Sequence, residues 1–214
     1  MAKIIGVIQV KGGAGRSTLA TNLAGEFSKL GRTVLIDGDM PQGTSASWYA
    51  IRQEIGKVGD LTADTAADHR ELIAKAEQHA QTADYIVLDG PPRIAEMTRA
   101  ILMLSDLCLV PVGASVAEIW ATTDVLDIIE QAKKVRPIDA RMIWTRHRPF
   151  TNLAKELSEQ ASKELGLPVL KTALGLWVAY PEALGAGLTV AEMHDLTAKA
   201  EIRLLVAEIR RIIR

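Results

Sequence analysis

The segment Val10-Lys11-Gly12-Gly13-Ala14-Gly15-Arg16-Ser17-Thr18 decides the fold of this chain. An apolar run over residues 4–8 precedes it and is typical of a buried strand. After it, apolar residues recur over positions 19–30 at the spacing of an amphipathic helix. A strand, a glycine-rich turn and a helix in this order form the context that a phosphate-binding loop requires.

The residue types in this segment suit a polyphosphate and a magnesium ion. The glycines allow the main chain to curl so that successive N–H groups point inward, and the helix N-terminus adds partial positive charge. Ser17 is placed to bring its hydroxyl to Mg²⁺, and Thr18 to reach a phosphate oxygen. A glycine turn with no ligand is the alternative, but the strand, the helix and the two hydroxyls together disfavour it.

Two positions depart from the usual pattern G-x-x-x-x-G-K-[ST]. Arg16 stands where the lysine is expected, and Val10, just before Lys11, stands where the first glycine is expected. A lysine before Gly-Gly resembles the deviant Walker A motif of the ParA/MinD superfamily of dimerising ATPases. In that family the early lysine reaches across the dimer interface to the partner's nucleotide, so the resemblance implies this role for Lys11. Arg16 does not match the family's second lysine.

The resemblance implies that this loop binds ATP or ADP. Lys11 and Arg16 are both expected to act in catalysis. The nucleotide-binding residues expected here are Lys11, Gly12, Gly13, Ala14, Gly15, Arg16, Ser17 and Thr18.

Acidic residues follow a second predicted strand at 33–36, in the sequence Asp37-Gly38-Asp39-Met40-Pro41-Gln42-Gly43. Acids at the carboxyl end of a strand in a parallel sheet lie where ligands bind. The alternative is an acidic turn that caps the next helix. The segment resembles the D-x-D-P-Q motif of ParA proteins, with Met40 as an extra residue. By that resemblance Asp39 positions or polarises the attacking water, and Asp37 lies near the magnesium ion.

A third strand, predicted at 85–88, ends in Asp89-Gly90-Pro91-Pro92. An apolar strand ending in aspartate is the Walker B pattern, in which the carboxylate holds a magnesium-bound water. Together with the upstream phosphate loop, this pattern is specific. The expected magnesium site therefore comprises Ser17, Asp37 and Asp89.

Length and composition limit the number of domains and the classes of partner that the chain could have. The chain has 214 residues, 48% of them hydrophobic, which fits one domain over 1–214 with an ample core. A net charge of −1 gives no global signal for nucleic-acid binding, which would need a local patch. Cys108 reads as a buried hydrophobe, and a lone cysteine suits a reducing cytoplasm. No apolar run approaches the roughly 20 residues of a membrane span, so no membrane partner is expected.

The remaining segments alternate between helix and strand signals, apart from mixed loop chemistry at 56–66. Trp120, in a helix predicted over 116–134, is assigned to core packing rather than to a ligand. The strand predicted at 141–145 ends, by family resemblance, at the lip of the base pocket, which makes Thr145 and Arg146 nucleotide contacts. His147 has no histidine or cysteine near it in sequence and is not expected to bind a metal. The other predicted elements are helices at 68–80, 94–104, 152–165, 180–186 and 198–214, and strands at 107–110 and 168–171.

This alternation predicts an α/β fold, with a mainly parallel twisted sheet covered by helices on both faces. It is the Rossmann-like arrangement of P-loop NTPases. The resemblance covers essentially the whole chain and is closest to short ParA proteins that lack an N-terminal DNA-binding extension.

The function implied is a slow, Mg²⁺-dependent ATPase that partitions plasmids or positions another cargo. Such a protein dimerises with ATP, binds DNA non-specifically on the bacterial nucleoid, and hydrolyses ATP when it meets a ParB-like centromere-binding protein or a cargo adaptor. A MinD-like membrane switch is the first alternative, although the helix at 198–214 favours core packing. A nucleotide-binding scaffold with little turnover is the second, because of Arg16. A nitrogenase-reductase-like role needs more cysteines than this chain has.

Two basic segments could bind the DNA backbone. The first comprises Lys133, Lys134, Arg136, Arg141, Arg146, Arg148 and Lys155, and the second Arg203, Arg210, Arg211 and Arg214. Binding through phosphates alone is independent of sequence and weakens steeply with salt.

Overall fold

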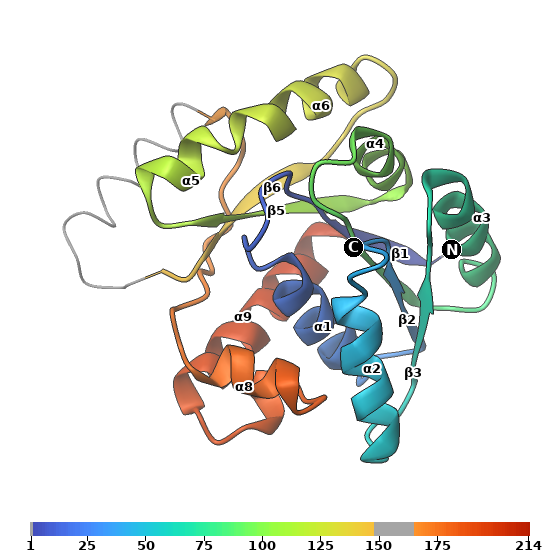
Figure 1. Ribbon diagram of the computed structural model, residues 1–214, viewed down its shortest axis with the longest axis vertical. Helices are drawn as coiled ribbons and strands as arrows, with labels where there is room; N and C mark the ends of the chain where they lie inside the picture. Colours follow the sequence, from blue (N-terminus) through green and yellow to red (C-terminus); the bar gives the residue numbers. More distant parts are fainter. Residues whose placement is uncertain (1, 148–164) are drawn as a thin grey trace.

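A computed structural model describes residues 2–147 and 165–214. Its centre is a parallel sheet of six strands in the order β3-β2-β4-β1-β5-β6 (Figure 1). The phosphate-loop strand therefore lies inside the sheet, between β4 and β5. The strands are β1 (Lys3–Val7), β2 (Thr33–Asp37), β3 (Leu61–Thr65), β4 (Tyr85–Asp89), β5 (Leu107–Gly113) and β6 (Ala140–Thr145).

Helices cover both faces of the sheet, as the sequence predicts (Figure 1). On one face lie α3 (His69–His79), α4 (Ala95–Leu104) and α6 (Thr123–Lys133). The other face carries α1 (Arg16–Phe27), α2 (Thr44–Glu54), α8 (Ala179–Gly185) and α9 (Leu196–Ile212). A short helix, α5 (Val116–Trp120), and a 3₁₀ turn, η1 (Val190–Glu192), complete the described elements.

The central strands are rich in apolar residues, because helices bury both faces of the sheet. Neighbouring residues of one strand point to opposite layers, so that Ile86 and Leu88 pack under α3 and α4 while Val87 packs under α1. This double burial explains why the central strands read as continuous apolar runs in the sequence.

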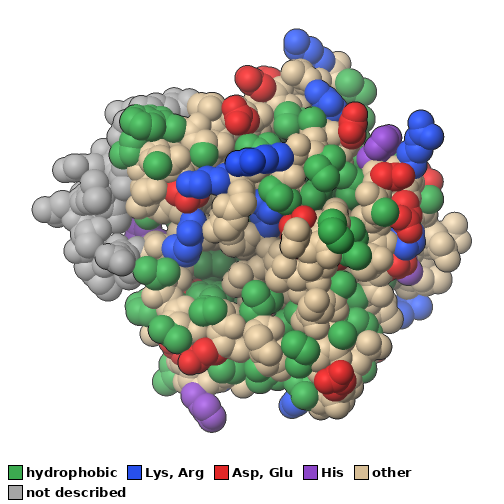
Figure 2. Space-filling model, viewed as in Figure 1, with side chains coloured by type: hydrophobic (Ala, Val, Ile, Leu, Met, Phe, Trp, Pro, Cys, Tyr) green, Lys and Arg blue, Asp and Glu red, His purple; other side chains and the backbone are tan. Residues whose placement is uncertain are grey.

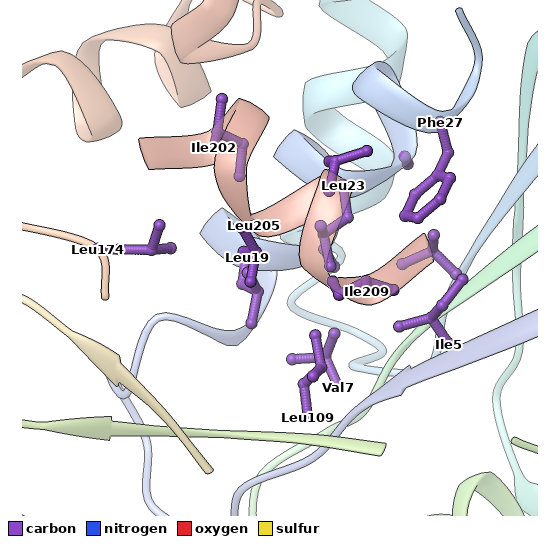
Figure 3. Close-up of a cluster of buried hydrophobic side chains, with 14 of the residues drawn as sticks. Ile5, Val7, Leu19, Leu23, Phe27, Leu109, Leu174, Ile202, Leu205 and Ile209 are labelled. Carbon is purple, nitrogen blue, oxygen red and sulfur yellow. The ribbon is translucent and has the colours of Figure 1, made fainter. Parts of the chain in front are cut away.

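The last described helix packs against the helix of the phosphate loop. In Figure 3, Ile202, Leu205 and Ile209 of α9 meet Leu19 and Leu23 of α1 above the sheet. All of these side chains are fully or almost fully buried. The prediction that the apolar stripe of the final helix belongs to the core is confirmed.

Several predictions of local structure are wrong. Residues 61–65 form an edge strand, β3, although only Leu61 is buried and the glycines just before it, Gly56 and Gly59, are typical of a loop. The predicted helix over 116–134 is divided into α5 and α6, with the side chain of Thr122 at the break bonded to Glu118 and Gln9. Trp120, assigned to the core, is 66% exposed.

At 168–171 the chain makes one β-bridge, between Val169 and Met142, instead of a strand. The helix predicted at 152–165 lies almost entirely outside the described residues, as do Arg148 and Lys155. Among residues 2–147 and 165–214, no helix is long and apolar enough to cross a bilayer.

Candidate nucleotide site

The loop between β1 and α1 has the backbone that a phosphate cradle needs. Gly13 and Gly15 take positive φ angles of 74° and 91°, which residues with a Cβ rarely adopt. A Cβ added at Gly12 or Gly13 would meet nothing within 4 Å, so the space beside these two glycines is open. The loop is thus preformed, and it leads into the positive N-terminal end of α1.

Arg16 is turned inward beneath this loop. Its Nε donates to the carbonyl of Gly90 at 2.7 Å, and its Nη1 donates to the carbonyls of Gln9 and Lys11 at 2.8 and 2.6 Å. Its side chain is only 6% exposed, and burial lowers the pKa of the guanidinium while the charges of Asp89 and Asp39 oppose that shift. Arg16 therefore joins both ends of the phosphate loop to the end of β4.

Lys11 lies at the opposite, open side of the loop. Its Nζ is 2.7 Å from Oε1 of Glu118 on α5, and Arg146 approaches the same oxygen at 3.1 Å. Burial works to raise the pKa of Glu118, but the hydrogen bond from Lys11 and the charge of Arg146 outweigh it, so the pKa is lowered. The carboxylate thus stays ionised at neutral pH and holds Lys11 within its own chain.

The two strand-end aspartates stand opposite each other. β2 and β4 pair so that Asp37 and Asp89 share a register position, and both are buried. Asp37 accepts hydrogen bonds from the amides of Asp39 and Ala46, both at 2.9 Å. Asp89 Oδ2 accepts from the Ser45 hydroxyl at 2.6 Å, while Asp89 Oδ1 is buried with no hydrogen-bond partner.

A cation would satisfy this arrangement. Burial and the charge of Asp37 raise the pKa of Asp89 to about 7, although hydrogen bonds from Ser45 and Ser17 oppose the shift. Two facing carboxylates with a spare oxygen, beside a serine hydroxyl, match the hard oxygen donors that Mg²⁺ prefers. In the described part of the chain no cluster of three or more His, Cys, Asp or Glu side chains forms a metal site, so phosphate oxygens and water would supply the other ligands.

Asp39 lies close to Arg16 and interacts with Asp37. Its Oδ2 is 3.7 Å from Arg16 Nη2, too far for a hydrogen bond but close enough for attraction. Burial raises the pKa of Asp39, the charge of Arg16 opposes this, and Asp37 adds to it. The structure thus brings Asp37, Asp39 and Asp89 together beneath the loop.

A cavity of about 380 Å³ adjoins the phosphate loop. Thr145 and Arg146, predicted at the lip of the base pocket, both line it, and the Thr145 hydroxyl donates to the carbonyl of Ala14 at 3.1 Å. Figure 2 shows a hollow on this face between α5 and α8, with Lys and Arg side chains close by. The remaining lining residues are Gly13, Gly15, Thr18, Leu174, Gly175, Leu176, Trp177, Val178, Tyr180, Pro181 and Leu184.

Sequence reasoning missed the far wall of this cavity and the partner of Lys11. Trp177 and Tyr180 lie far along the chain from the loop, at a predicted connection and at the first residue of a predicted helix, neither of which signals a nucleotide contact. The sequence predicts no role for Glu118. An acidic residue at the start of a helix after a buried strand was the signal available for it.

Comparisons with known proteins agree with this architecture. The family described as ATPase MipZ matches residues 3–151. Maintenance of carboxysome distribution protein A from Halothiobacillus neapolitanus is 27% identical over 211 residues, covering 96% of this chain and 95% of that protein. A structure of Cyanothece McdA with ATP superposes with a TM-score of 0.80 at 15% identity, covering 98% of this chain and 96% of that one. The structure of the septum site-determining protein MinD with Mg-ADP, from Pyrococcus horikoshii, superposes with a TM-score of 0.76 at 16% identity. The match covers 100% of this chain and 99% of that one.

Proposed function

Because the chain belongs to the ATPase MipZ family, among the ParA/MinD-type ATPases, we propose that it is a positioning ATPase that distributes DNA or another large cargo. In the proposed cycle it binds ATP with Mg²⁺, dimerises, binds DNA without sequence preference, and hydrolyses ATP when it meets an adaptor protein. The observation that carries the proposal is the open phosphate loop beside a buried carboxylate, Asp89, with an unpaired oxygen.

Each part of the site has a role in this proposal. The phosphates lie against the backbone of residues 12–18, and Mg²⁺ binds between them and Ser17, Asp37 and Asp89. Asp39 positions the attacking water. The base enters the cavity beside Thr145 and Arg146, whose apolar walls suit a flat ring.

Dimerisation is proposed through the face that carries Lys11. Within residues 2–147 and 165–214 the ammonium of Lys11 is held by the side chain of Glu118, and 36% of the lysine side chain is exposed, so it can exchange Glu118 for a partner's phosphate without disturbing the backbone. Exposed apolar residues on the neighbouring loops and on α5, namely Met40, Ile94, Val116 and Trp120, supply surface that a second copy would cover.

DNA binding is proposed mainly through α9. In the first basic segment Arg136 is bonded to main-chain carbonyls, Arg141 to Asp139 and Arg146 to Glu118. In contrast, the second segment comprises four exposed arginines without a described ion pair, namely Arg203, Arg210, Arg211 and Arg214. In a dimer these would be doubled, which strengthens attraction to phosphates.

One structural feature favours a second candidate function, a nucleotide-binding scaffold with little turnover. The guanidinium of Arg16 is directed at three carbonyls of its own chain, so its charge is already engaged before a phosphate binds. A membrane switch is less favoured, because the apolar stripe of α9 is used in the core.

The decisive experiment is calorimetric titration of ATP and ADP with Mg²⁺, followed by gel-shift assays on unrelated duplexes at several salt concentrations. We expect nucleotide binding, and DNA binding that needs ATP and falls steeply with salt. Replacing Arg210 and Arg211 with glutamine should weaken DNA binding more than the matched replacement of Lys133 and Lys134. Absence of nucleotide binding at millimolar concentration would refute the proposal; equal DNA binding without ATP would refute the cycle.

A further inference from the structure

The wall of the cavity opposite the phosphate loop is formed by residues 174–180, which comprise the end of the connection before α8 and the first two residues of that helix. One side of this segment is attached to the end of β6. Leu174 donates to the carbonyl of Trp144 at 2.8 Å and accepts from the amide of His147 at 2.9 Å, and Leu176 donates back to His147 at 3.0 Å. The start of the wall therefore continues the sheet.

The other side of the wall is attached to a single carboxylate, Glu201 of α9. Its Oε1 accepts from the indole Nε1 of Trp177 at 2.8 Å. Its Oε2 accepts from the amide of Gly175 at 2.9 Å and from the Tyr180 hydroxyl at 3.1 Å. Because all three donors belong to residues that line the cavity, this carboxylate fixes the shape of the wall.

The contacts around Glu201 are tightly fitted. The indole of Trp177 folds back over Gly175 so closely that a Cβ at Gly175 would lie 2.2 Å from its Nε1. Burial raises the pKa of Tyr180, and the charge of Glu201 raises it further, so the hydroxyl stays protonated and remains a donor. The next residue, Ile202, is fully buried against α1, which fixes the backbone that carries the carboxylate (Figure 3).

We propose that Glu201 is a positioning residue for the nucleotide base, acting through Gly175, Trp177 and Tyr180. The proposal rests on the function proposed above, in which this cavity receives the base. An ionised carboxylate only accepts hydrogen bonds, so it can serve three donors at once, whereas an amide cannot. Without it the wall loses its shape, while the phosphate cradle remains held by Arg16 and by the bond of Thr145 to Ala14.

Glu208 provides a matched control on the same helix. Its two carboxylate oxygens accept from the amides of Lys171 and Thr172, at 2.8 and 2.9 Å. It thus fixes the same connection as Glu201, but at residues that do not line the cavity. Any general loss of stability from loosening this connection should appear in both variants.

The test measures the affinity of the full chain for ATP and for inorganic tripolyphosphate, each with Mg²⁺, by calorimetry. For Glu201→Gln we expect ATP affinity to fall by about tenfold, the equivalent of roughly one lost charged hydrogen bond, with tripolyphosphate within about twofold of the parent. For Glu208→Gln both affinities should stay within about twofold of the parent. A milder variant, Trp177→Phe, removes one donor, and Glu201→Gln should cost less in that background than alone.

Three outcomes would overturn the proposal. Unchanged ATP affinity in Glu201→Gln would remove the role of this carboxylate, and an equal loss for ATP and tripolyphosphate would show that it supports the whole site rather than the base. An equal loss of ATP affinity in Glu208→Gln would assign the effect to the connection. If the parent binds neither ligand, the proposed function itself fails, which differs from all three.

Discussion

The two ends of the phosphate loop hold their positive charges in opposite ways. At the start, Lys11 is partly exposed and is held by the side chain of Glu118, 107 positions away along the chain. At the end, Arg16 is buried and bonded to three main-chain carbonyls. A side-chain partner can be exchanged by a rotamer change, whereas a carbonyl partner moves only with the backbone. The comparison indicates a fixed brace at Arg16 and a releasable charge at Lys11.

The largest effect is expected from removing the brace. Arg16→Ala leaves the carbonyls of Gln9, Lys11 and Gly90 without their donor, and should lower the free energy of unfolding by about 3 to 5 kcal/mol. Chemical denaturation without nucleotide measures this loss. Lys11→Ala is the matched control and should change the free energy of unfolding by less than about 1 kcal/mol, because partly exposed ion pairs contribute little. Equal losses in the two variants would erase the distinction between brace and releasable charge.

The second effect is a pH dependence of the free energy of unfolding, caused by the buried carboxyl of Asp89 near Arg16. The pKa of Asp89 is raised from 3.8 to about 7, so between these values the native protein binds a proton that the unfolded chain has lost. Its contribution to the free energy of unfolding should therefore fall as pH rises from about 4 to 7, by on the order of 2 to 4 kcal/mol. Denaturation of the parent and of Asp89→Asn across this range, in metal-free buffer, isolates the contribution. A constant difference between the two curves would contradict it.

The third effect concerns the releasable charge. Lys11→Ala should weaken ATP-dependent dimerisation at least about tenfold, because the proposed contact to the partner's phosphate is lost. Analytical ultracentrifugation with ATP and Mg²⁺ measures the dimer, and ATP affinity of the monomer should change little. If Lys11→Ala dimerised as well as the parent, the lysine would have no role across the interface.

The smallest effect is expected from replacing the arginine at position 16 with lysine, which keeps the positive charge. Arginine is a wide planar fork and lysine a compact charge on a flexible stem, so Arg16→Lys frees the charge to follow a phosphate. We expect turnover to rise a few-fold and stability to fall by less than in Arg16→Ala, since an ammonium can still donate to some of the carbonyls. Phosphate release at saturating ATP is the measurement. An unchanged or lower rate would favour the low-turnover scaffold.

The elements that read clearly from the sequence are those whose signals are local. The strands ending in Asp37 and Asp89 are continuous apolar runs closed by an acid, and they lie where predicted, at paired positions of neighbouring strands. The edge strand β3 is not predicted from the sequence, because it alternates polar and apolar residues shortly after two glycines and has one buried side chain, Leu61.

What the sequence could not provide are contacts between distant segments. The inward turn of Arg16 depends on a carbonyl at Gly90, and the wall of the cavity depends on Glu201, which sits on an otherwise ordinary amphipathic helix. Trp120 was assigned to the core because of its size, yet the break in the helix after it leaves the side chain exposed. The spacing of apolar residues along the sequence does not predict these contacts, because they form only when the helices pack on the sheet.

The packing of α9 on α1 has a consequence for how the protein is made. When the ribosome has synthesised the six strands and the phosphate loop, Ile202, Leu205 and Ile209 have not yet been made. These three residues cover the inner face of α1. During synthesis the nascent chain therefore exposes the apolar side of its own nucleotide helix until residues beyond 200 emerge. A protease that removed α9 from the finished protein would return it to that immature state, with one side of α1 uncovered and the cavity wall without its contacts to Glu201.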